Sequence, residues 1–340
     1  WASIGAMTCY LLGVGGVVAF LRIEWLMGDE ALLPLRLFRD RTFSLCSVQS
    51  AVIGMGMFGG IASIPLYLQI VKGASPRDAG LLMLPLIGAM MIASLTSGQL
   101  TSRTGHYKIF PVIGSFLMVI GMLTMTQIGA DTALWQTDIY MAIFGLGIGL
   151  NMQSIVLAMQ NAAEPRDMGV ATSAVTFFRQ VGGSLGTAIF LSILFSNAAS
   201  NVPKEYAKAQ NDPAFQAAIA AHPEQLKVIT GGLSLDDTSF LAKLAKPISH
   251  PFLVGFSDAM DMVFLVGGLV LVLSIVLTMM IKEVPLRMIS AQQARVAAES
   301  AAAATAAPSD LAIVAQTDQA DQERDHPSEV GDLSRVDLAK

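Results

Sequence analysis

The sequence predicts an all-α integral membrane protein with about seven transmembrane helices. Of its 340 residues, 53% are hydrophobic and only 14% are charged, against about 25% charged in a typical soluble domain, and the mean hydropathy is +0.58. The charges are also unevenly spaced, because the twenty-five residues between Asp138 and Glu164 carry none. An α-helix rises ~1.5 Å per residue, so roughly 20 apolar residues cross the ~30 Å hydrocarbon core of a bilayer.

Seven stretches of the chain have this length and apolar character. Six of them contain no charge, and the seventh, 168–203, contains only Arg179. The two cysteines, Cys9 and Cys46, both fall inside such stretches, where a structural disulfide or a metal site is not expected. We expect the spans near 2–21, 44–68, 80–100, 109–128, 138–159, 169–195 and 257–281.

Basic residues in the connections predict how the spans are oriented. Cytoplasmic connections of membrane proteins carry an excess of Lys and Arg. One set of alternate connections holds ten such residues, whereas the other short connections hold only Lys72 and Arg77. We therefore expect the first set, and the C-terminus with it, to face the cytoplasm from a plasma membrane, as in a bacterial inner membrane. The ten residues are Arg22, Arg36, Arg39, Arg41, Arg103, Lys108, Arg166, Lys282, Arg287 and Arg295.

Two segments are expected to lie outside the membrane. Residues 196–251 carry Pro203, Pro213, Pro223 and Pro247 with Ala-rich stretches between them, which predicts a periplasmic or extracellular loop with a short helix or two. Residues 286–340 are rich in Ala, Ser, Gln and Asp, which predicts a disordered cytoplasmic tail. The net charge of −5 comes from residues 309–340, which hold three basic and eight acidic groups. No basic face remains, so nucleic acid is not an expected partner.

The sharpest short motif is GQLTSRTGHYK, from Gly98 to Lys108, at a cytoplasmic turn between two spans. Gly98 lets two helices approach, and Gly105 supplies a tight-turn conformation. Arg103 and Lys108 can bind helix C-terminal carbonyls or anionic headgroups. A plain anchoring role at the membrane surface would explain the same charges.

The spacing of this motif resembles the loop signature of the major facilitator superfamily, G-x-x-x-D-R-x-G-R/K-R/K. Ser102 replaces its acidic residue, and His106 and Tyr107 replace two basic ones, as in the weakened copy found in the second half of such proteins. The gating role of Gly98, Arg103 and Gly105 is therefore only implied. Three further blocks are similar to the fourteen-span drug:proton antiporter branch of the family (the EmrB/QacA type). They are 34–43, 66–85 and 145–186.

The resemblance implies three parts. Residues 1–43 would form a linker transmembrane helix and a cytoplasmic loop, 44–285 a C-terminal six-helix bundle of two inverted three-helix repeats, and 286–340 the tail. It also implies proton-coupled export of drugs or other amphipathic small molecules. The partners would be the substrate, protons, the lipid bilayer and an N-terminal bundle of the same polypeptide that this chain lacks. The abrupt start at Trp1 suggests a fragment.

A faint internal symmetry agrees with inverted repeats. Gly54 and Gly56 in the second span correspond to Gly145, Gly147 and Gly149 in the fifth. Glycines at these positions allow helices to pack closely.

In the family that the chain resembles, the first and fourth helices of each half line the central cavity. Here these helices are 44–68 and 138–159. Their uncharged polar residues Gln49, Asn151 and Gln153 are therefore candidates for substrate binding. Hydrogen bonding between helices is the commoner use of such side chains.

Arg179 is the one strong charge at membrane depth, ~15 Å into its helix. A charge there is costly unless it faces a wet cavity, a carboxylate or backbone carbonyls. We expect it to contact an anionic substrate or a carboxylate of the proton route, and Phe178 and Gln180 are candidates beside it. A structural role, such as tying this helix to a missing bundle, fits the same position.

Asp258 and Asp261 are weak candidates for proton coupling. Residues 262–281 already form a full charge-free span, so both aspartates are expected at its outer N-terminal end. Negative charge at a helix N-terminus is favoured by the helix dipole, which gives them a structural explanation.

Other function classes remain open but fit the sequence less well. A membrane-embedded transferase would need His, Asp or Glu residues clustered near one interface, and the four histidines are scattered over a turn, a loop and the tail. A seven-span receptor or a non-transporting subunit fits the number of spans alone. No G-x-x-x-x-G-K-[ST] loop is present to bind ATP phosphates. We expect neither an enzyme nor a cofactor or metal site.

Overall fold

The computed structural model describes residues 4–28, 33–222, 224–225 and 244–281, and all regular elements within these ranges are helices. The long helices are α1 (Ile4–Met27), α2 (Arg41–Leu66), α4 (Leu84–Thr104), α5 (Ile109–Met125), α6 (Leu134–Ala162), α7 (Met168–Ala209) and α10 (Lys246–Met280). The short ones are η2 (Leu35–Arg39), η3 (Tyr67–Val71), α3 (Pro76–Leu82), η4 (Pro165–Asp167) and α8 (Pro213–Ala221).

The predicted fold class is confirmed, because each of the seven expected spans coincides with a helix. Six candidate spans in the described ranges are long and apolar enough to cross a membrane. The seventh expected span is α5, whose 17 residues are apolar but shorter. At ~1.5 Å per residue, α5 has about the minimum length that crosses a bilayer.

Local sequence explains where several helices begin and end. The Asp40 carboxylate caps α2 by accepting a hydrogen bond from the Phe43 amide, and Ser75 caps α3 through the Asp78 amide. Pro85 lacks an amide proton, and the chain breaks between α3 and α4 at Met83. Asp40 therefore sets the first residue of α2, and Ser75 sets the first residue of α3.

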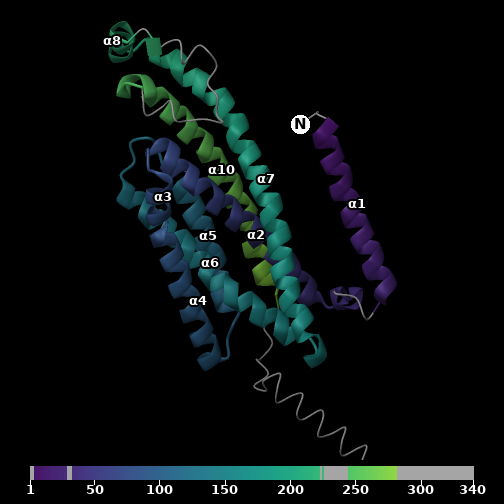
Figure 1. Cartoon of the computed structure of the whole chain (residues 1–340). Helices are drawn as coiled ribbons and strands as arrows, with labels where there is room; N and C mark the ends of the chain where they lie inside the picture. The colour runs from purple at the N-terminus through teal and green to yellow at the C-terminus, as the bar shows by residue number, and fades with distance from the viewer. Residues whose placement is uncertain (1–3, 29–32, 223, 226–243, 282–340) are drawn as a thin grey trace, which may run out of the picture. The chain divides into compact units, whose positions relative to one another are not determined.

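The six long helices that follow η2 pack in two layers. The front layer has the order α7, α2, α6, α4, in which each helix contacts the next. The back layer consists of α10, which contacts α7 and α2, and α5, which contacts α6 and α10. Figure 1 shows these helices running alongside one another, and helices that follow one another in the chain run in opposite directions.

Several contacts between helices repeat between the two halves of the bundle, whereas the α7–α10 contact has no comparable counterpart between α4 and α5. In this comparison α2 corresponds to α6, α4 to α7, and α5 to α10. The contacting pair α2–α7 then corresponds to α6–α4, and the pair α5–α6 corresponds to α10–α2. The pair α5–α10 maps onto itself. Because each group has three helices of alternating direction, the second group runs opposite to the first, as in an inverted repeat.

Glycines make the corresponding contacts in the two halves. A Cβ atom added to Gly54 would lie 2.1 Å from the Arg179 carbonyl oxygen on α7, and one on Gly145 would lie 2.3 Å from the Leu86 carbonyl oxygen on α4. Gly56 faces α10 at Leu271, and Gly147 faces α5 at Met118. The predicted symmetry of these positions therefore has a structural basis, since each glycine allows close approach to the equivalent neighbour.

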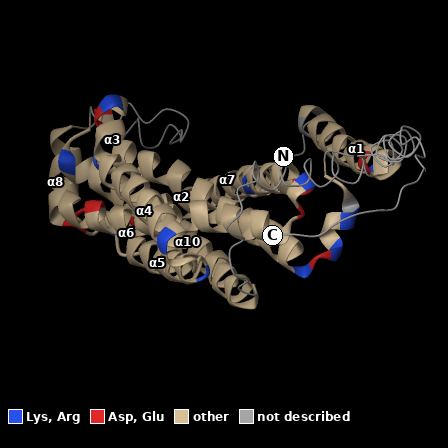
Figure 2. Cartoon of the chain, turned by 90° about the horizontal axis from the view of Figure 1, so that it is seen from below, with Lys and Arg blue, Asp and Glu red and all other residues tan. Residues whose placement is uncertain are grey.

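The connections between helices gather at two opposite ends of the bundle. The Arg36 end holds η2, the connections 105–108 and 163–167, and the end of α10. The Lys72 end holds the connections 72–75 and 126–133 and the start of α10. At the Arg36 end, the Lys108 ammonium donates to the Met279 carbonyl at 3.2 Å, so the start of α5 lies beside the end of α10. At the Lys72 end, the Tyr206 hydroxyl donates to the Ile248 carbonyl at 3.1 Å. Figure 2 shows the charged residues mostly at the ends of helices, with the helix bodies largely uncharged.

Helix α1 precedes the bundle and is exposed along most of its length. Its Phe20 ring stacks on Phe177 of α7 with centroids 5.9 Å apart. Near its end, the buried Glu24 carboxylate accepts a hydrogen bond from the Leu33 amide at 3.0 Å. The first contact joins α1 to α7, and the second joins α1 to the chain that leads into η2.

Both ends of the segment expected as a loop, 196–251, are helical. Helix α7 continues to Ala209, and α10 already begins at Lys246. The length of an apolar stretch indicates how much of a helix lies in the hydrocarbon core, and not where the helix ends. Both helices continue beyond their apolar stretches, and there Val202 of α7 packs against Gly255 of α10. The expected short helix is represented by α8, and the predicted tail, 286–340, lies outside the described residues.

Candidate functional site

Arg179 lies in the first third of α7, where its backbone packs against α2. It is 11 residues beyond Met168, which corresponds to ~16 Å along the helix axis. Its carbonyl approaches Gly54, and Gly182 and Gly186 of the next two turns approach the α2 backbone in the same way. The sequence therefore brings α7 so close to α2 that the Arg179 side chain is half-buried.

The buried part of the Arg179 guanidinium has no partner among the described residues. Its Nε atom is shielded from solvent and makes no hydrogen bond there. Because a guanidinium remains charged and is costly to bury without a counter-charge or acceptor, this position is suited to an acceptor from outside the described bundle.

Two aromatic residues, Phe177 and Phe178, directly precede Arg179 on α7. Phe178 meets Phe177 and Phe38 of η2 edge to face, with centroids 5.3 and 5.9 Å apart. Phe38 in turn meets Phe43 of α2 at 5.1 Å. Such edge-to-face pairs are favourable contacts, and they hold the α7 rings against the segment before α2.

Gln180 lies on an exposed polar stripe of α7. Thr176, Gln180 and Ser184 follow one another at intervals of four residues, and all three are exposed. Residues four apart lie on one face of a helix. Residues 176–184 of α7 therefore carry a charge, aromatic rings and uncharged hydrogen-bonding groups on more than one face of the helix.

Gln49 and Asn151 lie in a different place, inside the bundle. Both side chains are fully buried. The Gln49 amide nitrogen donates to Ser274 and Thr278 of α10 at 2.8 and 2.6 Å. Ser115 of α5 lies 2.9 Å from Ser274 and 3.4 Å from the Asn151 oxygen, so one network joins α2, α10, α5 and α6. This geometry favours the role of hydrogen bonding between helices that the sequence left open.

Gln153 is exposed on α6, near the Arg36 end. Its Cγ atom is 3.4 Å from the position that a Cβ of Gly98 would occupy, so it packs beside the start of the loop motif. Gln153 is therefore separated from the Gln49 and Asn151 network and remains accessible.

The loop motif forms the turn that its glycines predict. Gly105 has φ +73° and closes α4 in the left-handed conformation. Arg103 is exposed, and Lys108 binds the last turn of α10 as described above, which agrees with the predicted contact of a basic residue with C-terminal carbonyls.

The expected position of Asp258 and Asp261 at a helix N-terminus was wrong. Helix α10 begins at Lys246, so the two aspartates lie 12 and 15 residues inside it. Asp258 is exposed, whereas Asp261 is half-buried and its Oδ1 atom has no hydrogen-bond partner among the described residues. The helix dipole therefore does not explain these carboxylates, because it acts only within the first turn.

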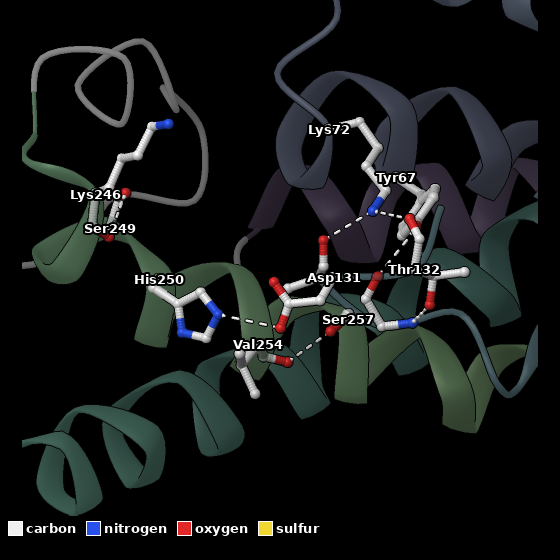
Figure 3. Close-up of polar contacts among 11 residues, drawn as sticks. Tyr67, Lys72, Asp131, Thr132, Lys246, Ser249, His250, Val254 and Ser257 are labelled. Atoms are coloured by element: carbon white, nitrogen blue, oxygen red, sulfur yellow. Dashed lines mark hydrogen bonds and ion pairs between the residues drawn. The ribbon is translucent and has the colours of Figure 1, made fainter. Parts of the chain in front are cut away.

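Lys72 forms a contact that the sequence analysis missed. Its ammonium donates to the Ala130 and Thr132 carbonyls at 2.7 and 2.6 Å (Figure 3). Tyr67 donates to the Gly129 carbonyl at 3.1 Å, so both residues hold the connection between α5 and α6. Burial lowers the pKa of Lys72, and the nearby Asp131 carboxylate partly opposes this shift.

A second contact at the Lys72 end joins the same connection to α10. The His250 Nε2 atom lies 3.5 Å from an Asp131 carboxylate oxygen, and both side chains are exposed (Figure 3). In sequence, only the basic character of Lys72 was a signal for this cluster. Among the described residues, no group of three or more His, Cys, Asp or Glu side chains could hold a metal ion.

Known proteins similar to this chain are membrane transporters. Residues 5–187 match the model of the Major Facilitator Superfamily. A tetracycline resistance determinant of Streptomyces rimosus is 35% identical over 83% of this chain and 84% of its own length. An uncharacterised MFS-type transporter of Mycobacterium tuberculosis is 37% identical over 83% of this chain. A multidrug transporter protein of Bacillus subtilis is 33% identical over 57% of this chain. The matched regions span 39% and 36% of the latter two relatives.

Proposed function

The chain belongs to the major facilitator superfamily, and on that premise we propose that it forms one helical bundle of a proton-coupled exporter of drugs or other amphipathic small molecules. The names of its relatives, which include a tetracycline resistance determinant and a multidrug transporter protein, support export. The fourteen-span antiporter type and the position of this chain in its C-terminal portion are parts of the same proposal.

One structural observation carries the proposal. Arg179 is a half-buried charge inside an apolar stretch of α7, ~16 Å from the start of the helix, and its Nε has no partner among the described residues. In a membrane, a charged side chain is tolerated where it meets a water-filled cavity, a ligand or an opposite charge. A transport pathway beside α7 supplies the first two of these.

A second bundle would complete the pathway. Transporters of this kind work by rocking two bundles about a site near the bilayer midplane. The front layer of α7, α2, α6 and α4 is the side that we assign to this second bundle. The greater length of the Mycobacterium and Bacillus relatives supports a second bundle within the same polypeptide.

The residues assigned to substrate contact are Arg179, Phe178 and Gln180, with Gln153 at the Arg36 end of the pathway. Gln49 and Asn151 instead hold the bundle together. Asp258 and Asp261 lie toward the Lys72 end, so we propose that the main coupling carboxylate belongs to the second bundle.

The excess of basic residues at the Arg36 end supports a cytoplasmic position for it. Among the short connections, that end holds Arg36, Arg39, Arg41, Arg103, Lys108 and Arg166, against Lys72 and Arg77 at the other end. This distribution follows the positive-inside rule for a plasma membrane protein.

Transport into inverted membrane vesicles from cells that produce the complete polypeptide tests the function. With a proton gradient imposed, tetracycline and other fluorescent drugs should accumulate inside the vesicles, and a protonophore should release them. Arg179→Ala should lower this accumulation at unchanged protein abundance, whereas Arg77→Ala, an exposed arginine at the Lys72 end, should not. Asp261→Asn should change it little. Accumulation that survives loss of the proton gradient would refute proton coupling.

A further inference from the structure

We propose that Arg179 makes the pathway selective for organic anions, namely carboxylates or acidic enols carried on an aromatic or polycyclic ring system. This inference rests on the proposed export function and deepens it by naming the chemical class of the substrate. It is carried by the distribution of charge along the bundle and by the side chains that precede and follow Arg179 on α7.

The acidic side chains of the six-helix bundle lie far from Arg179 along the helix axes. Outside that bundle, the buried Glu24 of α1 lies one turn beyond the Phe20 ring that stacks on Phe177, and it accepts a hydrogen bond from the Leu33 amide. Measured from the Arg36 end, Arg179 is 11 residues along α7, or ~16 Å, while Asp261 is 19 residues before the end of α10, or ~28 Å. Asp138 is only four residues from the start of α6 at the Lys72 end. Toward the Arg36 end, the buried Asp167 is already bound to Arg36. Within the six-helix bundle, Arg179 therefore has no described carboxylate close to it along the helix axes.

The guanidinium chemistry decides which ligand fits this position. Arginine presents a planar set of N–H donors that matches a carboxylate or enolate and cannot lose its proton at physiological pH. A lipophilic cation placed there would meet a like charge in partly desolvated surroundings, which is strongly unfavourable. An organic anion instead supplies the acceptor that the buried Nε lacks.

The neighbouring side chains indicate the rest of the ligand. Phe178 and Phe177, directly before Arg179, provide apolar ring surface, and the Phe177 side chain is 40% exposed. Gln180 and Ser184 add hydrogen-bonding groups on the exposed stripe. A flat, apolar ring system with one acidic group and several polar substituents fits these surroundings, since rings favour stacking or edge contact with phenylalanine.

The experiment compares two probes in proteoliposomes that contain the complete polypeptide. One is a fluorescent aromatic carboxylate, and the other is a fluorescent lipophilic cation of similar size. Binding is measured by fluorescence titration, and transport is measured with an imposed proton gradient. The variants are Arg179→Gln, Arg179→Lys and the control Arg77→Gln.

The inference expects Arg179→Gln to weaken binding and transport of the carboxylate by about tenfold or more, as for the loss of a hydrogen bond to a charged group. The cation should be handled as well as before or better, Arg179→Lys should retain part of the carboxylate binding, and Arg77→Gln should match the unaltered protein.

Two results would overturn the inference. Equal loss of both probes in Arg179→Gln, with normal folding and abundance, would mean that Arg179 pairs with a carboxylate of another segment instead. Preferred transport of the cation by the unaltered protein would also refute anion selectivity, although export would stand. If the unaltered protein transported neither probe nor tetracycline, the proposed function itself would fail.

Discussion

The Arg36 guanidinium donates to the Asp167 carboxylate at 2.9 Å, which joins η2, just before α2, to the turn that precedes α7. Asp167 is buried, whereas the Arg36 side chain is 30% exposed. Because α2 and α7 then pack along their lengths, this ion pair fixes where the two helices begin relative to each other.

Asp167→Asn should lower the free energy of unfolding by about 1–2 kcal/mol, toward the low end for a charged hydrogen bond because Arg36 is partly screened by solvent. Thermal unfolding of the purified protein in detergent measures the change. The control is Glu164→Gln, which breaks an exposed contact with Arg166 and should cost less than about 1 kcal/mol. Equal effects of the two substitutions would contradict the assigned role.

The sequence predicted the helices of this bundle better than it predicted their contacts. Charge-free length located the seven spans, and Gly105 marked its turn, because both depend on local physics. Arg36 and Asp167 are 131 positions apart, and nothing in the sequence alone pairs them.

In the candidate site, too, local features could be predicted from the sequence, whereas contacts between helices could not. Arg179 could be selected from sequence because a charge inside an apolar helix is rare and costly. Gln49 and Asn151 could not be assigned to the cavity or the interior, because that choice depends on Ser115, Ser274 and Thr278 from other helices. The start of α10 was misplaced because hydropathy records the hydrocarbon core and not the helix that continues past it.

Gly54→Ala should destabilise the bundle, because the new methyl group would lie 2.1 Å from the Arg179 carbonyl oxygen and force α2 and α7 apart. Overpacking of this kind costs about 1–3 kcal/mol. Gly88→Ala on α4 is the matched control, since its Cβ meets nothing within 4 Å, and it should be neutral or slightly stabilising. Unfolding temperatures in detergent compare the two, and similar values would argue against a tight contact between α2 and α7.

Gln49→Met should change the free energy of unfolding by no more than about 1 kcal/mol and leave export intact. Ser274 can still bond to Ser115 and Thr278 to the Ser274 carbonyl, and the substitution also removes the buried Oε1 atom that lacks a partner among the described residues. Val48→Met, an exposed neighbour on α2, serves as the control for added bulk. Loss of export at unchanged stability would instead assign Gln49 to substrate contact.

Lys72 should give the stability a characteristic dependence on alkaline pH. Its pKa is lowered in the fold, so between the folded value and the ordinary 10.5 the unfolded chain binds more protons. Stability from this group therefore rises with pH across that window. Lys72→Met should remove the rise, so the difference in unfolding temperature between the unaltered protein and the variant should grow as the pH approaches 10.5. Parallel curves would contradict the shift, and Arg77→Met controls for loss of a nearby charge.

The exchanged packing of the two helix groups bears on how the protein is made. Helices α2, α4 and α5 pack mainly against α6, α7 and α10 and only slightly against one another. During synthesis, the first three helices would therefore enter the bilayer as nearly separate rods, with lipid in place of their later neighbours. Assembly would have to wait until the ribosome had delivered α6 and α7, so the polypeptide commits to its bundle late and almost all at once.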